Sequence, residues 1–171
     1  MFEDPSDIEA RGHVLLAATY AGIGFGNGGV HLAHGMSYPV SGMVRDYVPE
    51  GYPPENPLVP HGMAVVLNAP AVFRFTARAN PALHLYAAQL MGKDVSNAKP
   101  EEAGEILAGA VIELMQKVGM PNGLKAVGYG PDDVDKMVAA TLPQHRVTKI
   151  SPRPASAEDL KQLFLDSMQI W

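Results

Sequence analysis

The amino-acid sequence predicts an all-α multi-helix bundle, and three observations support that prediction. Apolar residues recur at helical spacing along the chain, and no stretch shows the two-residue alternation of a half-buried strand. Helix-capping residues or prolines precede most of the apolar stretches, and glycine or proline follows them. The chain has 171 residues, of which 47% are hydrophobic, so we expect a single domain, residues 1–171, with its own core.

Composition and charge exclude several kinds of site and partner. The formal charge is −5 and the 13 lysines and arginines are scattered, which argues against a nucleic-acid or anionic-membrane surface. There is no cysteine, so a metal site must use histidines and carboxylates. The chain has no run of about 18 apolar residues and does not begin like a signal peptide. We therefore expect a soluble, intracellular protein whose partners are small molecules or other protein chains.

The glycine-rich segment GIGFGNGG, residues 22–29, fits the pattern G-x-G-x-x-G that cradles dinucleotide phosphates when it follows a strand. Here it follows residues 8–21, a predicted helix in which Ser6 and Glu9 have the spacing of a capping box. The acidic residues at the expected distance lie in a proline-rich loop. We therefore expect small residues that pack closely against a neighbouring helix or ligand, and not a phosphate loop.

Two further helices flank the proline-rich loop. Residues 30–38 are expected to form the second helix, which should kink or stop at Pro39 because the proline ring would clash with the carbonyl of Gly35. Residues 45–60 contain five prolines and are expected to be irregular. Residues 61–77 are hydrophobic nearly all round. Their valines and phenylalanines would also suit a strand, but the length favours a buried helix.

Four more helices are expected in the second half of the chain, and each has a recognisable start. Asn80 and Ser156 are typical N-caps, and prolines begin the other two helices. The expected boundaries are Asn80 to Gly92, Pro100 to Gly119, Pro131 to near Pro143, and Ser156 onward. The fifth helix, which begins at Pro100, shows one apolar stripe composed of Ala103, Ile106, Leu107, Ala110, Val111, Leu114 and Val118. The seventh, which begins at Ser156, directs four residues to the core: Leu160, Leu163, Phe164 and Met168.

Two of the six histidines are candidate metal ligands. His34 precedes Tyr38 by one helical turn, and His31, one turn earlier, would assist it. His61 lies where the proline-rich loop meets the third helix. Because zinc and iron accept neutral imidazole, His34 and His61 are as well suited to bind a metal as to be packed or solvated. The others, His13, His84 and His145, lack a chemical partner in the sequence, which favours a solvated or packed role.

Three stretches resemble the C-terminal half of the iron-containing alcohol dehydrogenase family, in particular its hydroxyacid-oxoacid transhydrogenase branch. They are AGIGFGNGGVHLAHGMSYPVSG, LVPHGMAVVLNAPAVFRFTA and TLPQHRVTKISPRP. The resemblance spans essentially the whole chain. It implies a helical C-terminal domain and a divalent metal, Fe²⁺ or Zn²⁺, held by one Asp and three His. Two of those histidines match His34 and His61.

The resemblance also implies several parts that the chain lacks. The remaining Asp and His ligands and the α/β dinucleotide-binding domain precede the region that matches, so NAD(P) would be bound mainly by that N-terminal domain. We expect this domain, or a separate chain carrying it, as a partner. Many members have a further histidine near the nicotinamide, where this sequence has Tyr38. Tyr38 is therefore the candidate catalytic residue, lining the substrate pocket rather than shuttling a proton.

Hydroxy-acid and oxo-acid substrates carry carboxylates, so a cationic anchor is needed, and the candidates are Arg45, Arg146 and Lys149. Each is otherwise an ordinary surface charge. With two ligands the chain alone should be inactive. Three interpretations remain open: half of a two-chain enzyme, a fragment, or a non-catalytic helical interaction module. We expect an exposed apolar face and self-association, and a cytoplasmic location, with the mitochondrial matrix as the alternative in a eukaryote.

Overall fold

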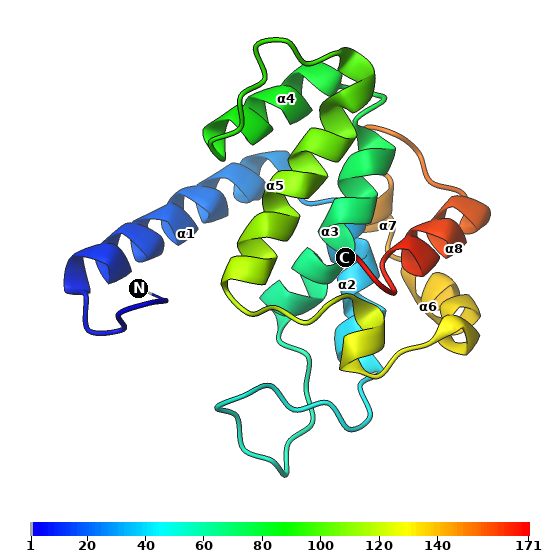
Figure 1. Cartoon of the computed structure of the whole chain (residues 1–171). Helices are drawn as coiled ribbons and strands as arrows, with labels where there is room; N and C mark the ends of the chain where they lie inside the picture. The colour runs from blue at the N-terminus through cyan, green and yellow to red at the C-terminus, as the bar shows by residue number, and fades with distance from the viewer. Residues whose placement is uncertain (1) are drawn as a thin grey trace. The chain divides into compact units, whose positions relative to one another are not determined.

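The computed structural model describes residues 2–171 and consists of helices joined by loops (Figure 1). No strand occurs in this range, so the prediction of an all-α fold is confirmed. The residues form two compact units: one ends at Val30 and the other runs from His31 to Trp171. In the described part of the chain, no helix combines the length and apolar character needed to cross a membrane.

The first unit contains one long helix, α1 (Ile8–Gly28). Its N-cap is Asp7, whose carboxylate accepts from Ala10 N–H at 2.9 Å, so the predicted capping box at Ser6 is wrong. The Ser6 hydroxyl instead donates to Asp4 Oδ1 at 2.7 Å, because a carboxylate two residues away is within its reach.

The glycine-rich segment continues α1 and is not a loop after it. The helix extends through Gly28 and ends at Gly29, whose φ of 74° is in the left-handed region that favours glycine. The Gly29 N–H donates to Phe25 O at 2.8 Å. The predicted end of the helix at residue 21 is therefore wrong, because glycine lowers helix stability by only about 1 kcal/mol and does not by itself stop a helix.

The second unit is built around α3, which packs against α2, α5 and α8 (Figure 1). Helix α2 also packs against α6 and α7, and α4 covers α5. The helices and short 3-10 turns (η) are α2 (Leu32–Gly42), α3 (His61–Thr76), α4 (Pro81–Leu90), η1 (Pro100–Glu102), α5 (Ala103–Lys117), η2 (Leu124–Val127), η3 (Pro131–Asp133), α6 (Val134–Thr141), α7 (His145–Thr148) and α8 (Ala157–Asp166). The 3-10 turn η2 and the short helix α7 were not predicted.

Helices α2 and α3 both contain a proline and continue through it. Helix α2 runs to Gly42, three residues past Pro39, so of the two predicted outcomes, a kink or a stop, the stop is wrong. Close packing explains the continuation, because Pro39 and six other residues of α2 are buried. Helix α3 is confirmed as a helix, with Pro70 inside it. Its buried Asn68 side chain donates to Ala64 O at 2.7 Å.

The predicted N-caps of α4 and α8 are confirmed. Asn80 Oδ1 accepts from Leu83 N–H at 3.2 Å, and Ser156 Oγ accepts from Asp159 N–H at 3.1 Å. The four core residues predicted for the last helix are all buried: Leu160, Leu163 and Phe164 lie in α8, and Met168 follows its end.

The buried face of α5 differs from the prediction near its end. Ala103, Leu107 and Val111 are buried as expected, but Leu114 is 52% exposed and Met115 is buried in its place. Residues four apart lie on one row of a helix, and that row continues to 115.

Candidate metal centre

His34 and His61 lie next to each other, although the long proline-rich loop separates them in the sequence. Their ring centroids are 5.3 Å apart and the ring planes are tilted by 56°. His34 is in the first turn of α2, and His61 is the first residue of α3. Figure 1 shows α2 and α3 side by side, with the loop between them extending away from the helices. The structure thus brings the two predicted metal-ligand candidates together.

The return of the proline-rich loop is fixed by contacts close to His61. The Ser41 hydroxyl near the end of α2 donates to Val59 O at 3.1 Å, and the Val59 side chain is buried. Farther along the loop, Leu58 N–H donates to Tyr47 O at 2.8 Å. These contacts end just before Pro60, which precedes the first residue of α3, so the position of the His61 backbone is set from α2.

The geometry of the pair and the protonation of His34 suit a divalent metal. Two imidazoles bound to one tetrahedral ion at about 2.0–2.1 Å would place their ring centroids roughly 5 Å apart, which agrees with the 5.3 Å found here. Burial lowers the pKa of His34, and repulsion from His61 and His31 lowers the pKa further. The neutral imidazole that binds metals is therefore the favoured form of His34 near pH 7.

The pair alone would complete only part of a metal coordination sphere. Within residues 2–171, no group of three or more His, Cys, Asp or Glu side chains could hold a metal. His31, which was expected to assist, is the residue preceding α2, and the structure does not group it with the pair. Its Nδ1 is buried without a hydrogen-bond partner in the described structure, and burial, with a smaller contribution from His84, lowers its pKa.

Tyr38, one turn beyond His34 on α2, forms a hydrogen bond with Arg146 of α7. Arg146 Nη2 on α7 donates to the Tyr38 hydroxyl at 3.0 Å. Tyr38 is half-buried and Arg146 is exposed. The candidate catalytic residue and one of the three candidate substrate anchors are thus in direct contact.

The other two predicted anchors lie in different surroundings. Arg45 forms an ion pair with Asp133, donates to Gly128 O at 3.2 Å, and lies over the ring of Tyr129 at 5.7 Å from its centroid. Lys149 is exposed at the end of α7. The guanidinium of Arg45 is therefore used in a contact between loops and helices, whereas Lys149 extends into solvent.

Comparison with known families identifies the chain. The model of the C-terminal part of the Fe-containing alcohol dehydrogenase family matches residues 1–168. The chain belongs to this family. The resemblance expected from the histidine-bearing stretches is thereby confirmed.

Curated relatives share the branch that the sequence resembles. A probable hydroxyacid-oxoacid transhydrogenase, mitochondrial, from Dictyostelium discoideum is 53% identical over 169 residues, which are 98% of this chain and 31% of the relative. The mitochondrial hydroxyacid-oxoacid transhydrogenase of Homo sapiens is 49% identical over 168 residues, which are 98% of this chain and 36% of the relative. The chain spans about a third of the length of these relatives.

Solved structures show the same fold. A 1,3-propanediol oxidoreductase has a TM-score of 0.82 at 24% identity, with 95% of this chain and 39% of that chain covered. An archaeal halo-thermophilic Red Sea brine pool alcohol dehydrogenase has a TM-score of 0.79 at 23% identity, with 96% and 39% covered. The second unit and α1 therefore correspond to a helical part of dehydrogenases that are more than twice as long.

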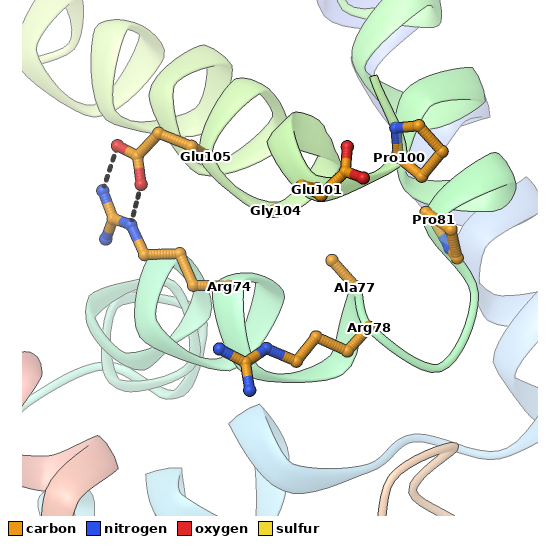
Figure 2. Close-up of a pocket in the computed structure, with 8 residues that line it drawn as sticks. All are labelled: Arg74, Ala77, Arg78, Pro81, Pro100, Glu101, Gly104 and Glu105. Atoms are coloured by element: carbon orange, nitrogen blue, oxygen red, sulfur yellow. Dashed lines mark hydrogen bonds and ion pairs between the residues drawn. The ribbon is translucent and has the colours of Figure 1, made fainter. Parts of the chain in front are cut away.

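The second unit also contains a cavity that is separate from the histidine pair. It has a volume of about 620 Å³ and lies where the end of α3 meets the starts of α4 and α5. Figure 2 shows the ion pair on one of its walls, in which Arg74 Nε and Nη2 donate to the Glu105 carboxylate at 2.5 and 2.9 Å. Arg78, on the same wall of α3, is exposed. Neither His34 nor His61 lines this cavity.

The structure also shows what the sequence could not reveal about His84. Its Nδ1 lies 2.8 Å from Asn80 O, its Nε2 lies 3.0 Å from Thr76 Oγ1, and its ring meets Phe73 edge-on. This is a packed histidine, one of the two roles expected for it. His13 and His145 are exposed. Of the contacts described above, the one between Tyr38 and Arg146 was not anticipated, because no local pattern connects residues 108 positions apart.

Proposed function

We propose that this chain is the C-terminal helical part of a metal-dependent alcohol dehydrogenase or hydroxyacid-oxoacid transhydrogenase, in which His34 and His61 supply two of the metal ligands. The convergence of the two imidazoles from separate helices carries the proposal. Family membership supports a metal and a nicotinamide cofactor. The names of the relatives favour hydroxy acids and oxo acids over plain alcohols, and the mitochondrial matrix over the cytoplasm.

The side chains have distinct roles in this proposal. His34 and His61 would each present one imidazole nitrogen to a bound metal, Fe²⁺ or Zn²⁺. A bound divalent metal acts as a Lewis acid that favours the alkoxide form of a substrate alcohol. Tyr38, on the same helical face as His34, lines the substrate pocket. The carboxylate of a hydroxy acid would be held by Arg45, Arg146 or Lys149.

The hydride acceptor, NAD(P), would be bound mainly by a dinucleotide-binding domain supplied by a further domain or chain. Two histidines hold a metal weakly, since catalytic zinc sites use about three protein ligands and an open position. We therefore expect negligible dehydrogenase activity from residues 1–171 alone.

Metal analysis tests this proposal. The chain should be purified alone and after co-expression with the part of the Dictyostelium discoideum relative that it does not cover. We expect Fe or Zn to be retained mainly by the complex. His34→Ala or His61→Ala should weaken metal binding by about 100-fold or more. Removing a residue that only hydrogen-bonds to a metal ligand costs about 10- to 100-fold, and removing the ligand itself should cost at least as much. The exposed His13→Ala is the matched control and should retain the metal. Unchanged metal content in both ligand variants would refute the proposal.

A second candidate function is a non-catalytic interaction or oligomerisation module, and α1 is the observation that favours it. No residue of α1 is buried, and its exposed large apolar side chains are Ile8, Val14, Leu15, Leu16, Tyr20, Ile23 and Phe25. Such a surface is typical of one that associates with another. Self-association of the chain, measured by sedimentation velocity, should decrease when Leu15 and Ile23 are replaced by Gln. A wild-type chain that remains monomeric at high concentration would contradict self-association.

A further inference from the structure

Arg146 differs from Arg45 and Arg74 in having no acidic partner within residues 2–171. Arg45 pairs with Asp133 and Arg74 pairs with Glu105. Arg153 donates to Phe75 O at 3.2 Å and stacks on the Phe75 ring at 3.8 Å. The contact found for Arg146 within residues 2–171 is to a neutral phenol oxygen. Its positive charge is therefore oriented but not neutralised.

The position of this guanidinium is set from α2. Tyr38 follows His34 by four residues, so both side chains project from the same face of the helix. Arg146 Nη2 donates one hydrogen bond to Tyr38, which leaves the other N–H donors of the planar fork available. The contact thus places a free cationic fork one helical turn from a proposed metal ligand.

Backbone packing supports the same arrangement. A Cβ atom on Gly35, next to His34, would lie 3.1 Å from Val147 Cγ2 and 3.6 Å from Thr148 Cγ2. Glycine at position 35 therefore lets α7 approach α2 closely, with the buried Val147 side chain against the helix backbone. Arg146 precedes Val147 directly, so the close contact between the helices holds Arg146 near the face of α2 that carries Tyr38.

We infer that Arg146, oriented by Tyr38, binds the carboxylate of the substrate and makes the site selective for hydroxy acids over plain alcohols. This inference rests on the proposed metal site at His34 and His61. Arg146 is the binding residue because its fork matches the two oxygens of a carboxylate. Tyr38 is a positioning residue that acts through Arg146. Arg45 is neutralised by Asp133 and is not the anchor.

Matched substrates that differ in one group test the selectivity. 3-Hydroxypropanoate and 1,3-propanediol share one alcohol end and differ in a carboxylate at the other, and four- and five-carbon pairs extend the series. In the co-expressed complex, Arg146→Ala should lower the ratio of kcat/KM for the acid to that for the diol by about 10- to 100-fold. Arg146→Lys, which retains the charge without the fork, should give a smaller decrease. Tyr38→Phe should raise KM for the acid more than it lowers kcat.

Two comparisons distinguish this role from others. Arg78→Ala removes an exposed guanidinium at the separate cavity and should leave the ratio unchanged. The KM for NAD(P) should also be unchanged in Arg146→Ala. If Arg146 instead bound a cofactor phosphate, its removal would raise the KM for NAD(P). An acid-to-diol ratio that stays constant in Arg146→Ala, or a raised KM for the cofactor, overturns the inference. Failure of the wild-type complex to oxidise any substrate of the series would count against the proposed function instead.

A binding measurement on the chain itself does not depend on turnover. Zn²⁺ is added to chain labelled in its tyrosine rings, and the NMR signals of Tyr38, assigned from Tyr38→Phe, are followed during titration. 3-Hydroxypropanoate should shift these signals in the wild type and in Arg78→Ala, and not in Arg146→Ala. 1,3-Propanediol should shift them little in any variant. Equal shifts with the acid and the diol, or shifts that persist in Arg146→Ala, contradict the anchor role.

Discussion

Helices α1 and α2 follow each other in the sequence and both contain glycine and alanine, but they use these small residues in opposite ways. None of the 21 residues of α1 is buried, whereas seven of the 11 residues of α2 are. A Cβ atom on Gly24 or Gly26 of α1 would have no neighbour within 4 Å, whereas a Cβ atom on Gly35 of α2 would lie 3.1 Å from Val147 Cγ2. A glycine in a helix therefore indicates close packing only where a neighbour fills the space.

The same contrast shows that the core and the candidate site lie in one unit. The second unit has a continuous core in which α3 contacts α2, α5 and α8. The proposed metal ligands and the carboxylate anchor all lie in this unit. Helix α1 offers apolar side chains without a core of its own, which suits a helix that is stabilised by another surface. Substitutions of the same type in the two units should therefore have very different effects on folding.

The largest expected difference is between two leucine truncations. Leu67 is fully buried in α3, whereas Leu16 is 49% exposed in α1. Leu67→Ala should lower the free energy of unfolding by about 2–5 kcal/mol, because it removes buried methyl groups and leaves a cavity. Leu16→Ala should change it by less than about 0.5 kcal/mol. Urea unfolding followed by circular dichroism gives both values, and similar losses for the two variants would show that α1 belongs to the same core.

A smaller difference is expected when a methyl group is added to a glycine. A Cβ atom on Gly104 of α5 would lie 2.8 Å from Arg74 Cα and 3.0 Å from Ala77 Cβ, so α3 and α5 would have to separate. Gly104→Ala should destabilise the second unit by about 1–3 kcal/mol. A Cβ atom on Gly24 of α1 would have no neighbour within 4 Å, so Gly24→Ala should be neutral or raise helicity.

Gly109→Ala is the control on the same helix as Gly104. Its Cβ would meet nothing within 4 Å, so the substitution should be neutral or stabilising by up to about 1 kcal/mol. Thermal unfolding of the three variants separates the helix-propensity effect from the packing effect. If Gly104→Ala is as stable as Gly109→Ala, the close approach of α3 and α5 is not required for stability.

Sequence reasoning succeeded where the determining contacts are local. The caps at Asn80 and Ser156 and the buried face of α8 follow from residues within one or two turns. It was wrong where a neighbouring residue or tertiary packing decides which residue caps a helix or enters the core. Asp7 replaces Ser6 as a cap, and Met115 replaces Leu114 in the core, because the rest of the protein selects one of two nearly equivalent choices.

The candidate site shows the same division between local and long-range information. The residue types of His34 and His61 indicated a metal, but only the packing of α2 against α3 shows that the rings meet. Their role as ligands stays a prediction until a metal is measured. The role of Arg45 illustrates the limit, since a guanidinium that was a candidate anchor in the sequence is paired with Asp133 at a distance of 88 residues.

The smallest expected effect is a pH dependence that involves this pair. The Arg45 guanidinium holds the pKa of Asp133 below its ordinary value, with a smaller contribution from the Gly130 N–H. Nearby, burial raises the pKa of Tyr129 to about 12, and its hydroxyl donates to Val40 O at 2.6 Å, linking this region to α2. Because the pKa of Asp133 is lowered in the folded state, its ionised form stabilises the fold.

The sign of the pH dependence follows directly. The contribution of Asp133 is fully present above the unfolded pKa of about 3.9 and is lost as the pH falls through the lowered folded value. Asp133→Asn should therefore lower the melting temperature slightly at pH 7 and flatten its decrease between about pH 5 and pH 2. The effect should be small because the Arg45 side chain is 53% exposed and water screens the pair.

Asp4 in the first unit provides the matched comparison. Hydrogen bonds from Ser6 also lower the pKa of Asp4, but both residues are exposed and only two positions apart. Asp4→Asn should leave the melting curve of the second unit unchanged at every pH, because the contact joins no elements of its core. If Asp4→Asn and Asp133→Asn flatten the curve equally, a lowered pKa reports only a local hydrogen bond, and the link between Arg45 and Asp133 does not stabilise the second unit.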